Sequence, residues 1–538
     1  MPIHKLHLGK FWRVFAVVFC ILGTVLSARS ATVTVYGNQT NQVIDGFGVN
    51  INSWSWSTNE IAPLLDAFID EAGMTLFRVV VRNGLESTND NEDASVPNWS
   101  YYNALYSSPE FEKLWGIMGY LNQKGITNGA MINPQGIGPE WLGSDILTPG
   151  LEDEWAEMIA TMLVYARNTR QIGFKLVAPH NEPDSLPEGI SIPTASQYVT
   201  TLHKLAELLD TNGLSDVRFV GPDRAGGSTT FLPEMMNDPL VIAKVAHFGV
   251  HSYSDQGSGS VDVRDFINLS GFPDRTLWVT EFNVWCPQCV GGSATNDWDY
   301  SRATAEYLLD HLGVGASAGL VWEGYDSYYP HDGFWTLFGL FTVNDTNAVP
   351  LTFTRAKGFY TVAQISKFVP PGAQNVNYSG FVFPMRLQTF FRKTSGRLSL
   401  TGVNPSDATT LDVTLTGLPS IPALELYCTT ATTNLALLAT IPVSNRTFTA
   451  TIPADCVFTL TGVEPSLPPP LLSASLQTNI IVISWPDYAL NYVLESTTNL
   501  AAPQVWLTVT NFPQSVSNRL TTPISPTGLQ QFFRLKKL

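Results

Sequence analysis

Two glutamates in this chain are placed for acid–base and nucleophilic chemistry. Glu182 lies in the stretch APHNEPD at residues 178–184, and Glu281 lies in LWVTEFN at residues 277–283. Each follows a short apolar run, so each carboxylate is expected at the end of a buried strand. A protonated acid paired with an ionised nucleophile is what cleavage of a glycosidic bond requires. For either glutamate alone, the alternative is a structural ion pair with a neighbouring arginine.

Three polar residues are expected beside this pair. Asn181 precedes the first glutamate and can hold a sugar hydroxyl. His251 and Tyr253 end another apolar run, in the order HSY, and Tyr253 can donate a hydrogen bond that keeps the second glutamate charged and aligned. His247 and His251 have the spacing of two metal ligands on a helix, but a strand is predicted here, so we expect no metal site.

An arginine and a tryptophan complete the predicted site. Arg78 and Arg82 share one face of a predicted strand, and an arginine beside the nucleophile favours its charged form. A structural ion pair below the site is the alternative for either arginine. Trp322, in VWEGY, is placed to form the floor of a sugar subsite, whereas Glu323 faces the opposite side and is expected to be structural.

Aromatic residues gather in the loops that follow the predicted strands. Ligand sites favour aromatic side chains, and the apolar faces of sugar rings stack on them. Any one of these residues alone is more often a packing residue, so the prediction concerns the group. Its members are Trp54, Trp56, Trp141, Trp285, Tyr328, Tyr329 and Trp335.

The chain supplies elements that would bring these residues together. Eight short apolar runs end in polar residues and alternate with helical patterns. This alternation predicts an α/β fold, a closed (β/α)₈ (TIM) barrel whose chemistry lies at the C-terminal ends of its strands. The predicted strands are 43–50, 76–82, 129–135, 174–182, 217–223, 245–253, 276–283 and 318–325, and the predicted helices include 60–71, 111–124, 152–170, 195–212 and 301–312.

The pattern of the sequence changes after about residue 365, where helical spacing gives way to short β-like runs. This change predicts a flanking β-sandwich, which an early strand at 32–36 is able to join, followed by a small all-β module. The predicted domains are a signal peptide at 1–30, the barrel at 31–365, the sandwich at 366–462, a proline-rich linker at 463–471 and the C-terminal module at 472–538.

Composition and the N-terminus narrow the classes of function. With 44% hydrophobic and 14% charged residues the chain is globular. Its net charge of −16 argues against a nucleic-acid partner and suits an uncharged substrate. A basic start, the run FAVVFCILGTVL and small residues at 27–31 predict a signal peptide, hence a protein that is secreted, periplasmic or on a bacterial cell surface. An uncleaved anchor is the alternative, and no later stretch is expected to span a membrane.

Four cysteines follow the predicted cleavage site, and an oxidising compartment permits disulfides. Cys428 and Cys456 lie in the strand-rich region, where they are able to bridge. Cys286 and Cys289 form a single CxxC with no second ligand pair, so a local disulfide or free thiols are expected rather than zinc.

The motifs resemble a known group. Asn181-Glu182-Pro183, His251-Ser-Tyr253, Thr280-Glu281 and Trp322 are similar to those of clan A, the retaining (β/α)₈ glycoside hydrolases. The opening DGFG at 45–48 and the flanking sandwich resemble glycoside hydrolase family 30 or an outlying relative, over roughly residues 32–462. The chain departs from that family in the strand end GVNIN and in lacking the proline that often follows the arginine corresponding to Arg78.

The resemblance implies Glu182 as acid/base, Glu281 as nucleophile, and a double displacement with retention, without metal or cofactor. We expect supporting or substrate-binding positions for the residues around them, namely Arg78, Asn181, His251, Tyr253, Trp322, Trp54 and Trp285. The expected protein is a monomer that acts on a polysaccharide, with endo action on a β-glucan or related β-glycan. Exo action, β-galactan and xylan are open alternatives, and a non-catalytic carbohydrate-binding barrel is the alternative to an enzyme.

Overall fold

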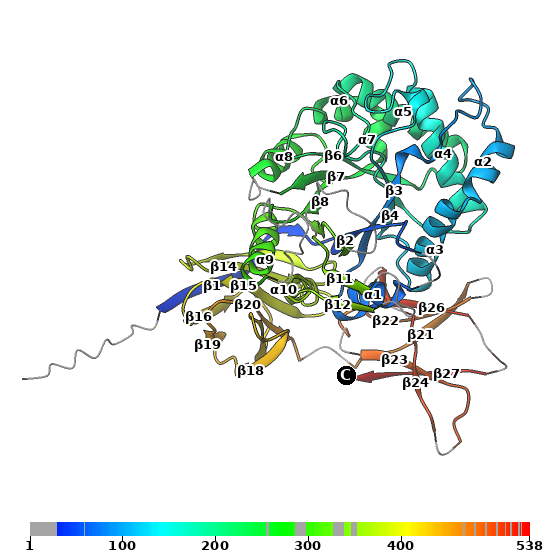
Figure 1. Ribbon diagram of the computed structural model, residues 1–538. Helices are drawn as coiled ribbons and strands as arrows, with labels where there is room; N and C mark the ends of the chain where they lie inside the picture. Colours follow the sequence, from blue (N-terminus) through cyan, green and yellow to red (C-terminus); the bar gives the residue numbers. More distant parts are fainter. Residues whose placement is uncertain are drawn as a thin grey trace, which may run out of the picture.

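The computed structural model contains a barrel, a β-sandwich beneath it and a small C-terminal β module (Figure 1). It describes residues 29–56, 58, 60–253, 258–285, 297–326, 338–345, 352–465, 469–477, 480–489, 492–501, 504–511, 513–516, 519–525, 528 and 530–537. The predicted signal peptide up to residue 28, the CxxC pair Cys286 and Cys289, and the aromatic residues Tyr328, Tyr329 and Trp335 lie outside these described residues.

Eight parallel strands form a closed barrel. They are β2 (Gly46–Asn52), β3 (Leu76–Arg82), β4 (Ala130–Gln135), β5 (Leu176–Val177), β6 (Arg218–Arg224), β7 (Val245–Ser252), β8 (Thr276–Phe282) and β9 (Ala318–Val321). Pairing of β2 with both β3 and β9 closes the ring. The strands are buried along almost their whole length, because helices cover the outside and side chains fill the inside. The predicted (β/α)₈ barrel is therefore confirmed.

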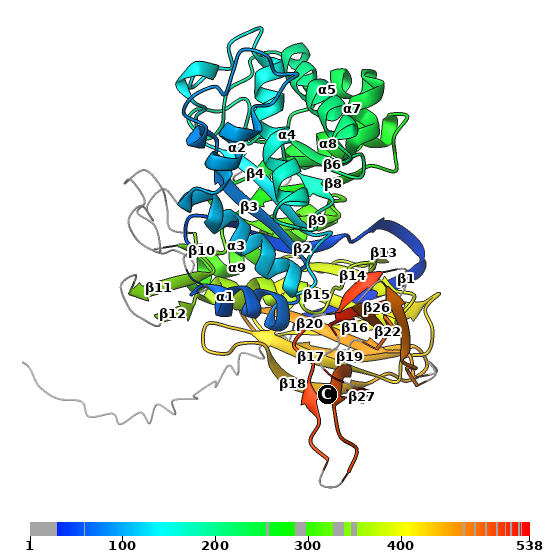
Figure 2. The same cartoon turned by 90° about the vertical axis from the view of Figure 1, so that its right-hand side faces the viewer.

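Helices cover the outside of the barrel (Figures 1 and 2). Five of them fall where the sequence predicts helices: α1 (Ala62–Asp66, continued by a π-helical turn at Ala67–Glu71), α3 (Pro109–Gln123), α4 (Glu152–Asn168), α5 (Ala195–Thr211) and α9 (Trp298–Gly313). The other helices are α2 (Trp99–Tyr106), α6 (Leu232–Asn237), α7 (Pro239–Lys244), α8 (Ser258–Leu269) and α10 (Lys357–Ser366), and a small sheet comprises β10 (Tyr325–Asp326), β11 (Phe341–Asp345) and β12 (Thr352–Arg355).

The β-sandwich is built from one nine-stranded sheet that folds around its own apolar core. Its strands are β1 (Arg29–Val43), β13 (Gln374–Ser379), β14 (Arg386–Arg392), β15 (Arg397–Asn404), β16 (Thr409–Thr416), β17 (Ala423–Thr429), β18 (Ala436–Pro442), β19 (Thr447–Ile452) and β20 (Cys456–Val463). The first strand, β1, lies between β13 and β16 (Figure 2), so the N-terminal strand is part of the sandwich. Cys428 and Cys456 are free, buried thiols rather than a disulfide.

The sandwich supports the barrel through two helices. Thr361 of α10 donates a hydrogen bond to the carbonyl of Ser301 in α9 at 2.8 Å, and Trp298 of α9 donates to Asp455 beside β20 at 2.7 Å. Because α9 connects β8 to β9, these contacts fix two barrel strands that carry predicted site residues.

The C-terminal module consists of two small sheets. One contains β21 (Ser473–Gln477), β22 (Ile480–Pro486), β25 (Gln514–Val516) and β26 (Arg519–Ile524); the other contains β23 (Tyr492–Thr497), β24 (Leu507–Thr508) and β27 (Phe532–Lys537). A buried ion pair of 3.0 Å between Arg392 and Asp487 joins the module to the sandwich. Among the described residues, no helix has the length and apolar character needed to span a membrane.

Candidate active site

The two predicted glutamates meet at the C-terminal mouth of the barrel. Glu182 follows the short strand β5, and Glu281 is the penultimate residue of β8. One carboxylate oxygen of each lies within 4.8 Å of the other. Both side chains are nearly buried, with 8% of Glu182 and 4% of Glu281 exposed. The fold thus brings together two carboxylates that lie far apart in the sequence.

Glu281 is surrounded by hydrogen-bond donors. Its Oε1 accepts from Arg78 at 2.5 Å and from Gln135 at 3.1 Å, and its Oε2 accepts from the hydroxyl of Tyr253 at 2.8 Å. Burial, together with the charges of Glu281 and Glu182, raises the pKa of Tyr253 well above its usual value, so the phenol stays a donor. Three donated hydrogen bonds, one of them from a guanidinium, stabilise a negative charge on Glu281.

Arg78 is the centre of a buried polar network. Its side chain is fully buried, and it reaches from β3 to Asp223 of β6 at 3.1 Å and to Asn181 at 2.7 Å. It also donates to Asn50 of β2 at 2.9 Å. Thr280 donates to the other oxygen of Asp223 at 2.6 Å. A buried charge is tolerated when it is paired and hydrogen-bonded in this way.

The backbone at Glu182 explains why β5 is shorter than predicted. Pro179 and Pro183 have no N–H to donate to a sheet, so the chain leaves the ladder after Val177. Glu182 then takes a positive φ of 38°, a conformation that costs energy for a residue with a side chain. Its own N–H donates to the carbonyl of Asp223 at 2.9 Å, which holds this bend.

His251 lies between the two glutamates. Its Nδ1 is 2.7 Å from Glu182 Oε1 and 3.4 Å from Glu281 Oε2, and its ring is completely buried. Burial lowers the pKa of His251, but the charges of Glu281 and Glu182 outweigh it, so the pKa is raised overall. His251 is therefore placed to orient Glu182 and to respond to the charge on both carboxylates.

Aromatic side chains extend from the nucleophile side of the site. The ring of Tyr253 lies 6.3 Å from that of Trp285 and 6.2 Å from that of Phe338, which also packs against Trp322. Trp285 is 48% exposed, as a residue that contacts substrate would be. These contacts place Trp285 and Trp322 in one aromatic cluster with Tyr253, the residue that donates to Glu281.

The other predicted aromatic residues differ in position. Trp54 stacks on Arg82, whose guanidinium carbon lies 4.9 Å from the centre of the Trp54 ring. Trp56, which the sequence placed only in the aromatic group, is a packing residue, buried in the core against Tyr120 at 5.6 Å. Trp141 is half-buried, and its indole donates to the carbonyl of Glu86 at 2.9 Å.

Four residues of the network were not assigned a role from the sequence: Asn50, Gln135, Asp223 and Thr280. The first three each lie at or near the polar end of a predicted barrel strand, which is the signal that marks them. In the sequence, Thr280 is marked only by its place directly before Glu281.

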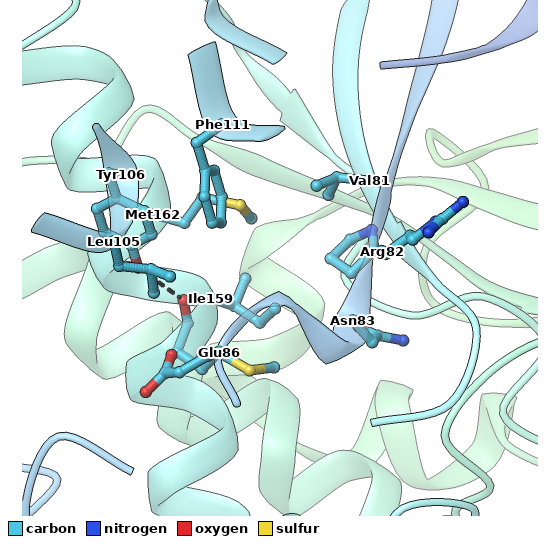
Figure 3. Close-up of a pocket in the computed structure, with 11 residues that line it drawn as sticks. Val81, Arg82, Asn83, Glu86, Leu105, Tyr106, Phe111, Ile159 and Met162 are labelled. Atoms are coloured by element: carbon cyan, nitrogen blue, oxygen red, sulfur yellow. Dashed lines mark hydrogen bonds between the residues drawn. The ribbon is translucent and has the colours of Figure 1, made fainter. Parts of the chain in front are cut away.

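The group formed by Glu182, His251 and Glu281 has the spacing of a metal site. The hydrogen bonds of Glu281 argue against a bound metal ion. Both of its oxygens already accept hydrogen bonds, and one of them lies against the guanidinium of Arg78. A separate small apolar pocket lies between β3 and α4 (Figure 3), lined by residues such as Val81, Phe111 and Met162. It shares no residue with the carboxylate group, so we place the active site at the barrel mouth.

The fold and the site define the class of structure to which the chain belongs. It is a (β/α)₈ barrel with a flanking β-sandwich, two carboxylates at the ends of β5 and β8, and a buried arginine on one of them.

Solved structures of glycoside hydrolases share this fold. A family 30 endoxylanase from Clostridium papyrosolvens superposes with a TM-score of 0.61 at 18% identity, over 80% of this chain and 100% of that one. A family 30 subfamily 8 xylanase from Clostridium acetobutylicum has a TM-score of 0.60 at 16% identity, over 80% and 99%. An endo-β-1,6-glucanase has a TM-score of 0.60 at 16% identity, over 80% and 94%. The resemblance to family 30 seen in the motifs is confirmed for the fold. No family model matches the sequence, and no curated protein matches it.

Proposed function

We propose that this chain is a secreted retaining β-glycoside hydrolase that cleaves a polysaccharide by double displacement, with endo action on a β-glucan or related β-glycan. The observation that carries the proposal is the approach of Glu182 and Glu281, since one carboxylate oxygen of each lies within 4.8 Å of the other at the barrel mouth. Retaining enzymes place these carboxyls about 5–5.5 Å apart, and inverting enzymes about 6.5–9.5 Å apart, to admit a water. The short separation supports retention.

The surroundings of the two glutamates support different roles for them. Glu281 is paired with the guanidinium of Arg78 and accepts from Tyr253, so its charged form is stabilised and suits a nucleophile. Glu182 has no arginine or lysine in an ion pair among the described residues, and its neighbour is His251. Glu182 is therefore the carboxyl that can carry a proton to the leaving group.

The proposed reaction has two balanced steps. Glu281 attacks the anomeric carbon while Glu182 gives its proton to the glycosidic oxygen, so the carbon–oxygen bond breaks and the sugar alcohol leaves. A water then attacks the glycosyl ester, Glu182 takes the proton of that water, and Glu281 is released as a carboxylate. Two inversions at one carbon give net retention.

The choice of substrate rests on the aromatic residues and on the similar structures. Tyr253 contacts Glu281, and the neighbouring rings of Trp285 and Trp322 provide flat faces, as the binding of a sugar ring requires. The similar solved structures include xylanases and an endo-β-1,6-glucanase, which act on β-linked polysaccharides. These features support a β-glycan as substrate, with cleavage inside the chain.

The test is product analysis followed by stereochemistry. The secreted protein would be incubated with β-1,3-glucan, β-1,6-glucan, β-galactan and xylan, and released oligosaccharides would be separated by size. For the polysaccharide that is cleaved, ¹H NMR during the first minutes would record the anomer that forms first. We expect oligosaccharides of mixed length and the β anomer first.

The Glu281→Gln variant is the control, since it keeps the shape of the side chain and removes the nucleophile. First appearance of the α anomer would contradict retention. Binding of a polysaccharide without turnover by the wild type would instead identify a non-catalytic carbohydrate-binding barrel.

A further inference from the structure

We propose that Asp90, Glu154 and Glu157 form a Ca²⁺-binding site that fixes the loop after β3 to helix α4. Asp90 lies in the segment between β3 and α2, and the two glutamates lie in the first turns of α4. One carboxylate oxygen from each of the three residues lies within 4.8 Å of the other two. Glu154 and Glu157 are three residues apart on a helix, so they project from the same face toward Asp90.

Glu157 is a buried carboxylate without a hydrogen-bond partner of its own within the described ranges of the chain. Only 1% of this residue is exposed, and neither of its carboxylate oxygens has a hydrogen-bond partner among the described residues. At this point the described backbone of α4 has no free N–H to donate to the carboxylate. Glu157 lies after the first turn, and N–H groups there already bond to carbonyls of the same helix. A buried carboxylate without a partner is costly, and such groups are usually satisfied by a proton, a donor or a cation.

The neighbours of Glu157 supply polar donors but no positive charge. Asn89 donates to Glu154 at 3.1 Å, and the hydroxyl of Tyr102 lies 3.4 Å from Asp90 and 3.2 Å from Glu86. Glu86 is itself 2% exposed, with one oxygen that has no hydrogen-bond partner in the described part of the chain.

No lysine, arginine or histidine of the described residues pairs with any of these four acids. The active site differs, since there the guanidinium of Arg78 forms ion pairs with both buried carboxylates, Asp223 and Glu281. The acidic cluster therefore has negative charge that no described positive side chain balances, and a divalent cation would balance it.

Protons are the competing way to remove this charge. Burial, followed by repulsion from Asp90 and Glu154, raises the pKa of Glu157 to about 8. Burial and the nearby acids also raise the pKa of Glu86 to about 8. Without a cation, both side chains therefore take up protons near neutral pH, and a bound cation has to displace those protons.

The chemistry of the ligands selects the cation. The cluster offers only oxygen, from carboxylates and the amide of Asn89, and no histidine or cysteine belongs to it. Zinc prefers nitrogen and sulfur, whereas Ca²⁺ takes six to eight oxygens in a flexible arrangement. Mg²⁺ demands a regular octahedron and keeps several waters, which suits a buried group of three carboxylates less well.

The position of the site indicates what a bound Ca²⁺ would do. The segment that contains Asp90 also contains Asn83, which donates to the carbonyl of Gly136 at 2.7 Å beside β4, and Glu86, whose carbonyl accepts from Trp141. Figure 3 shows Glu86 at the edge of the apolar pocket between this segment and α4. A cation here would hold the loop after β3 against helix α4 at the rim of the barrel mouth, and so raise the stability of the barrel without taking part in the reaction.

The test uses the full chain freed of metal with EDTA and then dialysed. Terbium(III), which replaces Ca²⁺ and is excited by energy transfer from Tyr101 and Tyr102, would be titrated at pH 7 and then displaced with CaCl₂. We expect one luminescent site, displaced by Ca²⁺ with a dissociation constant below about 1 mM. Saturating Ca²⁺ is expected to raise the unfolding temperature by several degrees because it binds only the folded state. Mg²⁺ at the same concentration is expected to give a smaller rise.

Variants locate the site. Glu157→Gln and Asp90→Asn are expected to weaken Ca²⁺ binding by about tenfold or more and to abolish the thermal response. Metal-free Glu157→Gln is expected to be at least as stable as the metal-free wild type, because the amide is neutral without having to take up a proton. Glu112→Gln on α3, an exposed glutamate paired with Arg170, is the matched control and is expected to bind as the wild type does.

Three results would overturn the proposal. The first is a wild type that shows neither terbium luminescence nor a Ca²⁺-dependent shift, which would mean that protons alone neutralise the cluster. The second is binding that is lost in Glu281→Gln and kept in Asp90→Asn, which would place the cation at the active site. The third is an equal response to Mg²⁺ and Ca²⁺, which would contradict selection of Ca²⁺.

Discussion

Arg78 and Asp223, from strands β3 and β6, form an ion pair of 3.1 Å in which both side chains are completely buried. The same guanidinium lies 2.5 Å from Glu281, so one positive charge serves two buried carboxylates. This pairing links the stability of the barrel to the charge of the proposed nucleophile.

Replacing Arg78 with Met is expected to lower the free energy of unfolding by about 3–5 kcal/mol, because two buried carboxylates lose their partner. Turnover is expected to disappear as well. Chemical denaturation and a turnover assay would measure the two effects. Arg82→Met is the control on the same strand, since Arg82 is exposed and stacks on Trp54.

The double variant Arg78→Met with Asp223→Asn separates the two roles of the arginine. It removes one of the two unpaired charges and is expected to recover part of the stability without recovering turnover. Recovery of turnover would show that the charge on Arg78 is not needed at Glu281.

Tyr253→Phe removes one hydrogen bond to Glu281 and keeps the ring. A hydrogen bond to a charged group contributes about 1.5–3 kcal/mol, so we expect kcat to fall by about 10- to 150-fold. Tyr300→Phe is a close control, because Tyr300 packs in the same aromatic cluster and its hydroxyl has no partner among the described residues. An equal fall in both variants would contradict the role of the hydrogen bond.

Two histidines on β7 are expected to change stability with pH in opposite directions. The pKa of His251 is raised in the folded state, so its stabilisation is complete below the unfolded value of about 6.5 and is lost as the pH rises through the folded pKa. Burial lowers the pKa of His247 to about 3, so wild-type stability falls with pH below about 6.5, as the unfolded state takes up the proton.

Urea midpoints would be recorded for the wild type, His251→Gln and His247→Gln at pH 5, 6.5 and 9. The difference in urea midpoint between wild type and His251→Gln is expected to shrink as the pH rises from 6.5 to 9. The difference in urea midpoint between wild type and His247→Gln is expected to change between pH 5 and 6.5 instead. A pH-independent gap for His251→Gln would mean that the carboxylates do not hold its proton.

Trp285→Ala is expected to raise KM for the polysaccharide more than it lowers kcat, because this exposed ring lies beside Tyr253 and not at the reacting atoms. Phe381→Ala is the control, since Phe381 is an exposed aromatic residue on the sandwich. A fall in kcat with unchanged KM would place Trp285 in the reaction itself.

The periodicity of the sequence predicted the barrel well, because each strand is a continuous apolar run that ends in polar residues. It missed helix α10, whose sequence KGFYTVAQIS contains Gly, Thr and Val, and which is stabilised by burial against the sandwich. It also did not single out α2, WSYYNALY, a helix of two turns whose buried residues Tyr102 and Tyr106 stack on each other. Tertiary packing overrides local preference in both cases.

The two glutamates could be predicted because strand ends meet at one face of a barrel, and Arg78 because alternate residues of a strand share one face. The partnership of Arg78 with Asp223 could not, since β3 and β6 are not neighbours and the contact crosses the closed barrel. The acidic cluster was also missed. Asp90 belongs to a polar loop, and Glu154 and Glu157 belong to a helix start, where acidic residues are common for reasons of the helix dipole.

Trapping the covalent intermediate tests the central claim most directly. A β-glycoside with fluorine at C2 and a good leaving group reacts with the nucleophile, but the fluorine slows hydrolysis of the ester that forms. Intact-mass and peptide mass spectrometry would then locate the sugar. We predict one added glycosyl unit on the peptide that contains Glu281, and none in Glu281→Gln. A labelled residue other than Glu281, or full turnover by Glu281→Gln, would contradict the account.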